Sequence, residues 1–215
     1  MEAMKKELVC NLIILDESGS MHSLYREMIE GVNGLFQNIN TIAKEYPEQE
    51  HRISFVVFSS DRIKTMMNLE SINGRVSISS EDYRPHGNTP LYDAIGKAIM
   101  DLKPQIAHRD NAKVLVSIFT DGMENNSRVY DAESIKRLVA ECEENGYTFT
   151  YIGAEHDIYR ASRRMNIRNT KPFHKSPQGI RRMMEEDYRE RSMFYDRIRK
   201  NDRNLRDDYF RDEDR

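Results

Sequence analysis

Short apolar runs that alternate with amphipathic segments constrain the fold of this chain more than any other feature. Four runs are rich in apolar residues, at 8–15, 52–58, 113–120 and 147–153, and the first is apolar at nearly every position. Such runs are typical of strands covered on both faces. Helical spacing of apolar residues lies between them, at 22–45, 90–102 and 131–145. This alternation predicts a three-layer α/β fold with a mostly parallel central sheet and helices on both faces.

Weaker patterns complete the outline. We expect a strand over 63–69, a short helix around 157–165, a strand near 170–174 and a last helix that begins near Ser176-Pro177. Pro90 suits the first position of the helix over 90–102, because its fixed φ and missing N–H are tolerated there.

The last 35 residues form a separate zone of the sequence. Residues 181–215 hold 11 basic and 11 acidic side chains, and their weak 4-3-4-3 apolar spacing is interrupted by Arg191 and Asp202. We therefore expect a globular domain over 7–180 and a charged helical or partly disordered tail over 181–215 that continues off the domain. A weakly specified coiled coil is the alternative.

Composition excludes several classes of protein. The chain has 33 Lys and Arg against 36 Asp and Glu, a net charge of −3, and so lacks the basic surface of a nucleic-acid-binding protein. No apolar run approaches the roughly 18 residues that suggest a membrane span, and the first run lacks the cleavage pattern of a signal peptide. Cys10 and Cys142 form neither a disulfide framework nor a zinc set, and two reduced thiols fit a reducing compartment. We expect a cytoplasmic protein with no membrane partner.

Oxygen-bearing side chains follow the two best predicted strands. The first run ends in Asp16-Glu17-Ser18-Gly19-Ser20, and the run over 113–120 ends in Asp121-Gly122. In an open parallel sheet, ligands bind beyond the carboxyl ends of the strands, where the strand order reverses. Two carboxylates in such a crevice repel, so a proton or a cation must compensate. The nearby serine hydroxyls favour a cation, and oxygen donors suit Mg²⁺ or Mn²⁺.

The Asp-x-Ser-x-Ser segment after the first run resembles the metal-ion-dependent adhesion site of the von Willebrand factor type A domain. Two later segments are similar to the rest of that motif in the same order: 87–95, GNTPLYDAI, and 119–122, FTDG. Five positions match its metal-binding residues: Asp16, Ser18, Ser20, Thr89 and Asp121. The resemblance covers roughly residues 7–180 and implies the three-layer, Rossmann-like fold of that family.

The resemblance also implies a function. Ser18, Ser20 and Thr89 would bind the ion directly, and Asp16 and Asp121 would act directly or through water. One coordination position would stay open for an acidic side chain of a partner. We therefore expect a non-catalytic, divalent-metal-dependent protein-binding module that recognises an Asp or Glu of another protein.

Further residues refine this expectation. Segments 125–128 and 151–154 resemble a bacterial intracellular subgroup that includes proteins encoded near tellurite-resistance genes, which suggests an adaptor role. Four neighbours of the motif are candidates for a rim that a partner would contact: Glu17, His86, Met123 and Glu124. A structural hydrogen bond is the expected role of Asp93.

Other interpretations explain single parts of the pattern. Asp16 and Ser18 could cap a helix, Thr89-Pro90 could be an N-cap followed by a first helical residue, and Asp121-Gly122 is a common turn. Among whole-protein functions, an accessory subunit of an AAA+ ATPase or of a stress-response complex is one alternative. A Mg²⁺-dependent phosphohydrolase is another, although Ser18 stands where such phosphatases have a second Asp. A tail that carries the function, with the domain as scaffold, is a third.

Overall fold

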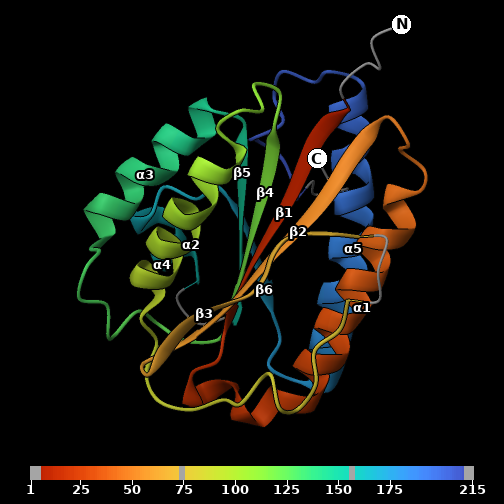
Figure 1. Ribbon diagram of the computed structural model, residues 1–215. Coiled ribbons are helices and arrows are strands. Elements are labelled where there is room, and N and C mark those ends of the chain that lie inside the picture. The colour runs from red at the N-terminus through yellow and green to blue at the C-terminus, as the bar shows by residue number, and fades with distance from the viewer. Residues whose placement is uncertain (1–5, 73–75, 155–157, 211–215) are drawn as a thin grey trace, which may run out of the picture.

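The computed structural model describes residues 6–72, 76–154 and 158–210, and these form three layers (Figure 1). Within them, six strands make one sheet in the order β3-β2-β1-β4-β5-β6. The strands are β1 (Glu7–Asp16), β2 (Gln49–Ser59), β3 (Arg62–Ser71), β4 (Lys113–Thr120), β5 (Tyr147–Ala154) and β6 (Asn169–Phe173). Only the edge strand β3 runs antiparallel to its neighbour in this described sheet. The predicted mostly parallel α/β fold is confirmed.

Helices cover both faces of the sheet. They are the 3₁₀ helix η1 (Gly19–Leu24), α1 (Tyr25–Ala43), α2 (Leu91–Ile106), α3 (Ala132–Glu144), α4 (Ile158–Arg164) and α5 (Pro177–Arg199). Helices α1 and α5 lie on one face, and α2, α3 and α4 lie on the other (Figure 1). The helix predicted over 22–45 is therefore a 3₁₀ turn followed by an α-helix, and α2 has Pro90 as its N-cap rather than as its first residue. Asp157, in the predicted short helix, lies outside the described residues.

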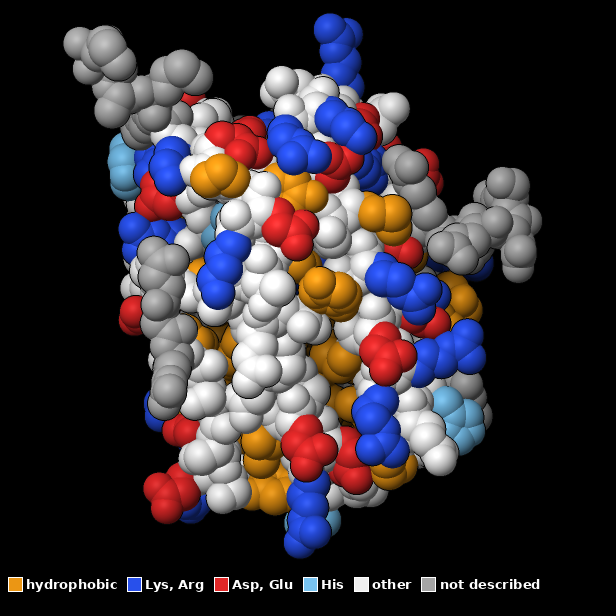
Figure 2. Space-filling view, turned by 90° about the vertical axis from the view of Figure 1, so that its right-hand side faces the viewer, with side chains coloured by type: hydrophobic (Ala, Val, Ile, Leu, Met, Phe, Trp, Pro, Cys, Tyr) orange, Lys and Arg blue, Asp and Glu red, His pale blue; other side chains and the backbone are white. Residues whose placement is uncertain are grey.

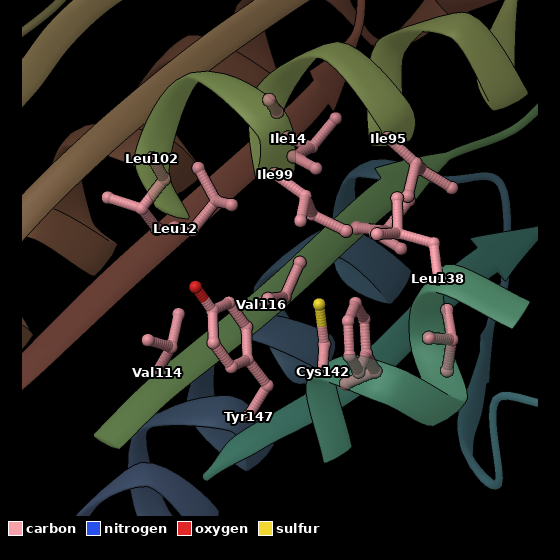
Figure 3. Packing of buried hydrophobic residues seen from close by; sticks show 14 of the residues in the cluster. Leu12, Ile14, Ile95, Ile99, Leu102, Val114, Val116, Leu138, Cys142 and Tyr147 are labelled. Carbon is pink, nitrogen blue, oxygen red and sulfur yellow. The ribbon is translucent and has the colours of Figure 1, made fainter. Parts of the chain in front are cut away.

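Apolar side chains fill the space between the sheet and each helical layer. On the α2 and α3 side, Ile95, Ile99 and Leu102 of α2 pack with Leu12 and Ile14 of β1 (Figure 3). These side chains are buried, and the α2 residues recur at the 3–4 spacing of one helical face. The two-sided burial explains why β1 is apolar along almost its whole length.

The sheet order brings two strand ends together. Strand β1 pairs in parallel with β2 on one side and with β4 on the other, and Leu15 is opposite Phe119. The chain leaves β1 through α1 toward β2 and reaches β4 only after α2, so the strand order reverses between β1 and β4. This is the switch point where ligands bind in open α/β sheets, and Asp16 and Asp121 both lie at it.

Helix α5 differs from the expected tail. Residues 181–199 are helical as predicted, but the helix does not continue off the domain, because it packs beside α1 on the sheet. Arg191 is fully buried there, and beyond the helix Tyr209 is buried as well. Charged side chains of both signs are scattered over the outer surface of α1 and α5, with hydrophobic side chains showing between them (Figure 2). Residues 211–215 of the predicted tail lie outside the described residues.

A buried polar network holds α5 on the sheet. The guanidinium of Arg191 forms an ion pair with Asp187 at 3.0 Å. It also donates to Asn11 Oδ1 at 2.7 Å and to Ser117 Oγ at 3.0 Å. The hydroxyl of Tyr209 donates to Asp187 at 3.1 Å. These partners satisfy a charge that could not otherwise be buried, which is why an arginine occupies a core position.

In the described part of the chain, no helix is long and apolar enough to cross a membrane.

Candidate metal centre

Two buried side chains form the floor of the candidate site. Asp16 ends β1, and both it and Ser18 are at most 1% exposed. Asp16 Oδ1 accepts a hydrogen bond from the backbone N–H of Ser18 at 2.7 Å, and Oδ2 accepts one from Thr120 Oγ1 at 2.5 Å. The hydroxyl of Tyr83 donates to the Asp16 carbonyl at 2.9 Å. The Asp16 carboxylate is therefore held in one orientation from several sides.

Hydroxyl groups connect this floor to the second aspartate. Ser18 Oγ and Ser20 Oγ are 3.1 Å apart, and Ser20 Oγ donates to Asp121 Oδ1 at 2.5 Å. Ser20 is exposed, whereas the carboxylate of Asp121 is buried. The site therefore has a buried base and opens to solvent at Ser20.

Gly122 marks the point on which the oxygens converge. A Cβ atom at this glycine would lie 2.8 Å from Thr89 Oγ1 and 3.5 Å from both Asp16 Oδ2 and Ser20 Oγ. Three side-chain oxygens from two separate segments, 16–20 and 87–95, thus surround one position, and glycine leaves it open. The structure brings Asp16, Ser18, Ser20, Thr89 and Asp121 together as the sequence motif predicts.

Local capping does not explain these hydroxyls. Ser18 is the N-cap of η1, but its side chain makes no capping hydrogen bond. Thr89 is not the N-cap of α2, because Pro90 occupies that position. Pro90 makes no side-chain capping hydrogen bond. Instead, Glu124 accepts from the N–H of Tyr92 and Ser127 Oγ accepts from the N–H of Asp93. The alternative of a simple cap is therefore wrong for the side chains of Ser18 and Thr89.

The electrostatics of the site favour a positive charge. Burial raises the pKa of Asp16 to about 6, hydrogen bonds from Thr120 and Ser18 act against this shift, and the charge of Asp121 adds to it. The Nζ atom of Lys175 lies 2.5 Å from Asp121 Oδ2. Even so, Asp121 Oδ2 is a buried oxygen that accepts no aligned hydrogen bond from the described residues. Two neighbouring buried carboxylates attract a cation, and the ammonium group of Lys175 already lies against one of them.

The donor set fits a hard divalent ion. All five side chains offer oxygen, three of them as neutral hydroxyls, and Mg²⁺ and Mn²⁺ prefer oxygen ligands. Among the described residues, no three His, Cys, Asp or Glu side chains gather at a spacing that would hold a metal. A metal centre at this edge of the sheet would therefore depend on the serine and threonine oxygens.

Glu17 does not lie on the rim. Its side chain is fully buried and accepts from Arg62 Nε at 2.8 Å and from Arg62 Nη2 at 2.6 Å. It also accepts from the backbone N–H of Arg84. The rim role expected for Glu17 is therefore wrong, because the carboxylate joins the end of β1 to the start of β3 and to the loop at Arg84.

The other rim candidates divide between two roles. Met123 is 52% exposed and can contact a partner. His86 is partly exposed, with Nε2 3.2 Å from both Ser59 Oγ and Asp61 Oδ2. Glu124 is held inward by the N–H groups of Tyr92, Asn126 and Ser127, so the structure gives it a structural role rather than the expected rim role.

Sequence reasoning did not identify three residues that contact Asp16 or Asp121 at the site: Thr120, Tyr83 and Lys175. Thr120 could have been found, because it directly precedes Asp121 at the end of β4. Lys175 carries no local signal, since it lies 54 positions after Asp121 and only the pairing of β4, β5 and β6 brings their ends to one edge. Asp93 does have the expected structural role, accepting from the N–H groups of residues 128–130.

Comparison with solved structures supports the fold. The chain resembles the PilB minor pilin from Streptococcus sanguinis (12% identity, TM-score 0.62), covering 89% of this chain and 63% of that one. It also resembles the manganese-loaded TRAP protein of Plasmodium vivax (17% identity, TM-score 0.53), covering 77% of this chain and 65% of that one. A third similar structure is the VWA domain of SpRpn10 (18% identity, TM-score 0.55), covering 85% of this chain and 94% of that one. The chain spans less than two thirds of the pilin and TRAP chains.

Sequence comparison identifies the family. No curated protein matches the chain. Residues 12–179, however, match the von Willebrand factor type A domain, and this segment contains the five converging side chains. The chain therefore belongs to the von Willebrand factor type A domain family.

Proposed function

We propose that this protein is a non-catalytic, divalent-metal-dependent module that binds other proteins. The observation that carries this proposal is the convergence of Thr89, Asp16 and Ser20 oxygens around the open position at Gly122. The manganese-loaded state of the TRAP protein supports a divalent ion in a related fold. Mg²⁺ and Mn²⁺ are the proposed ions.

The proposed ligand set contains three neutral hydroxyl groups and two carboxylates. Ser18, Ser20 and Thr89 would hold the ion through hydroxyl oxygens, which leave most of its charge uncompensated. Asp16 and Asp121 would hold it directly or through water. When bound, a divalent ion supplies a positive coordination point for an external carboxylate. The proposed partner is therefore a protein that presents an Asp or Glu side chain.

The surroundings of the site support recognition at this edge. Ser20 opens to solvent, and the exposed side chain of Met123 lies next to Gly122 in the sequence. Buried contacts of Asp16 with Thr120 and Ser18 keep the floor in place without the ion. A preorganised floor with an exposed mouth favours binding to a protruding side chain.

The proposed setting is the interior of a bacterial cell, where the protein would act as an adaptor. Cys10 and Cys142 are buried and unpaired, which is compatible with a reducing compartment. The similarity of segments 125–128 and 151–154 to a bacterial intracellular subgroup also supports this setting.

Peptide display with immobilised protein tests the proposal. Selection in Mg²⁺ should enrich peptides that contain Asp or Glu, and selection in EDTA should not. Thr89→Val removes one hydroxyl at nearly constant volume and should abolish the enrichment, whereas Thr65→Val at an exposed position of β3 should not. Equal enrichment in Mg²⁺ and EDTA would refute metal-dependent recognition. Hydrolysis of an aryl phosphate that Asp16→Asn abolishes would favour the phosphohydrolase alternative instead.

A further inference from the structure

Lys175 lies at the candidate metal centre, although it belongs to none of the motif segments. Its Nζ atom is 2.5 Å from Asp121 Oδ2. The Asp121 side chain is fully buried, whereas that of Lys175 is 39% exposed. Of the described Lys and Arg side chains, Lys175 alone lies within 4 Å of a carboxylate oxygen of Asp16 or Asp121. A cationic group thus reaches the buried carboxylate from the solvent side.

The backbone around Lys175 is held tightly. It lies between β6 and α5, at the edge of the sheet where β1 and β4 also end (Figure 1). Ser176 Oγ caps α5 by accepting from the N–H of Gly179 at 3.1 Å. A Cβ at Gly179 would lie only 1.9 Å from the carbonyl oxygen of His174, so the loop and the first turn of α5 pack without spare room. The lysine side chain can therefore move more easily than the backbone that carries it.

The contact with Asp121 is a charge contact that another cation can replace. Asp121 Oδ2 accepts no aligned hydrogen bond among the described residues, despite the short distance to Nζ. The lysine is also partly hydrated. Leaving Asp121 would return the ammonium group to water, so a divalent ion with several oxygen ligands can displace it.

We propose that Lys175 is a tethered counterion that competes with the divalent ion for Asp121 and so lowers the affinity of the centre for that ion. This inference rests on the proposed metal-dependent function. The apparent affinity for the ion is the intrinsic affinity multiplied by the fraction of molecules in which Lys175 has left Asp121. If Lys175 contacts Asp121 in about nine molecules of ten, removing the ammonium group strengthens ion binding about tenfold. Lys175 would then set the ion concentration above which the module can bind a partner.

Calorimetric titration of Mn²⁺ and Mg²⁺ into the full chain tests this proposal. Lys175→Gln removes the charge and keeps a polar side chain, and Lys175→Arg keeps the charge. Lys171→Gln is the matched control, because Lys171 also precedes α5 but pairs with Glu186 at 3.1 Å. Thermal unfolding in EDTA gives a second readout, since the ammonium group stabilises the ion-free centre.

The expected result is about tenfold tighter binding by Lys175→Gln, with Lys175→Arg and Lys171→Gln close to the wild type. Lys175→Gln should also unfold at a lower temperature than the wild type in EDTA and recover when Mn²⁺ is added. Ion binding by the wild type that Lys175→Gln leaves unchanged or weakens would overturn this inference alone. An absence of ion binding in both proteins would overturn the proposed function and this inference with it. Binding by Lys175→Gln but not by the wild type would support both.

Discussion

Removing the buried charge of Arg191 should destabilise the whole domain. The substitution Arg191→Met keeps much of the side-chain volume but leaves the Asp187 carboxylate, which is 1% exposed, without its ion pair at 3.0 Å. It also removes hydrogen bonds to Asn11 Oδ1 and Ser117 Oγ. Breaking a buried pair by removing one partner costs about 3–5 kcal/mol. A typical domain has a free energy of unfolding of about 5–15 kcal/mol, so this loss is a large share of it.

Urea unfolding followed by circular dichroism measures this cost. With a slope of about 2 kcal/mol per molar urea, the midpoint should fall by about 2 M. Arg182→Met is the control, because Arg182 is 82% exposed on the same helix, and its midpoint should stay near that of the wild type. The double variant Arg191→Met with Asp187→Asn removes both charges and keeps an acceptor for Tyr209, so it should be more stable than Arg191→Met alone. A midpoint change below about 0.5 M for Arg191→Met, or a double variant less stable than the single one, would refute the reasoning.

Three further predictions concern the site, the pH dependence and the thiols. Gly122→Ala places a Cβ 2.8 Å from Thr89 Oγ1, so it should weaken Mn²⁺ binding at least tenfold in calorimetry while the protein stays folded; wild-type affinity would contradict the convergence of ligands at this position. Burial lowers the pKa of His51 to about 4, and neither ring nitrogen has a hydrogen-bond partner among the described residues. His51 therefore binds a proton near pH 6.5 in the unfolded chain but only near pH 4 in the folded protein. Its protonation does not reduce the free energy of unfolding above pH 6.5 and reduces it progressively as the pH falls from 6.5 to 4. Between pH 7.5 and pH 5 the wild type should lose about 2 kcal/mol more than His51→Phe in urea unfolding, and equal losses would contradict the assignment. Burial also raises the pKa of Cys10 to about 12 and that of Cys142 to about 11, so neither thiol should react with an aromatic disulfide reagent at pH 8 until the protein unfolds; rapid reaction in the native state would show that the core opens.

The fold and the five converging residues could be predicted because their signals are local. Each buried strand is one short apolar run, and Asp16 and Asp121 directly follow two such runs. Parallel pairing then places the ends of β1 and β4 at the same edge, as the topology of alternating strands and helices requires. The motif also places Thr89 two residues before the first residue of α2.

The packing of α5 could not be predicted in the same way. Arg191 interrupts an apolar spacing, and a charged residue on a helix is normally solvated. Its partners Asn11 and Ser117 lie 180 and 74 positions away, so no local pattern shows that they complete a buried network. For the same reason Glu17, which is buried by Arg62 from 45 positions away, was expected on the rim.

The most direct test of the central claim is calorimetric titration of Mn²⁺ into the wild-type protein and into Thr89→Val, with Thr65→Val as control. The wild type and the control should bind one ion per chain, and Thr89→Val should bind at least tenfold more weakly, because Thr89 Oγ1 is one of the oxygens around Gly122. A folded wild-type protein that binds no ion, or a Thr89→Val variant that binds as the wild type does, would contradict the metal centre.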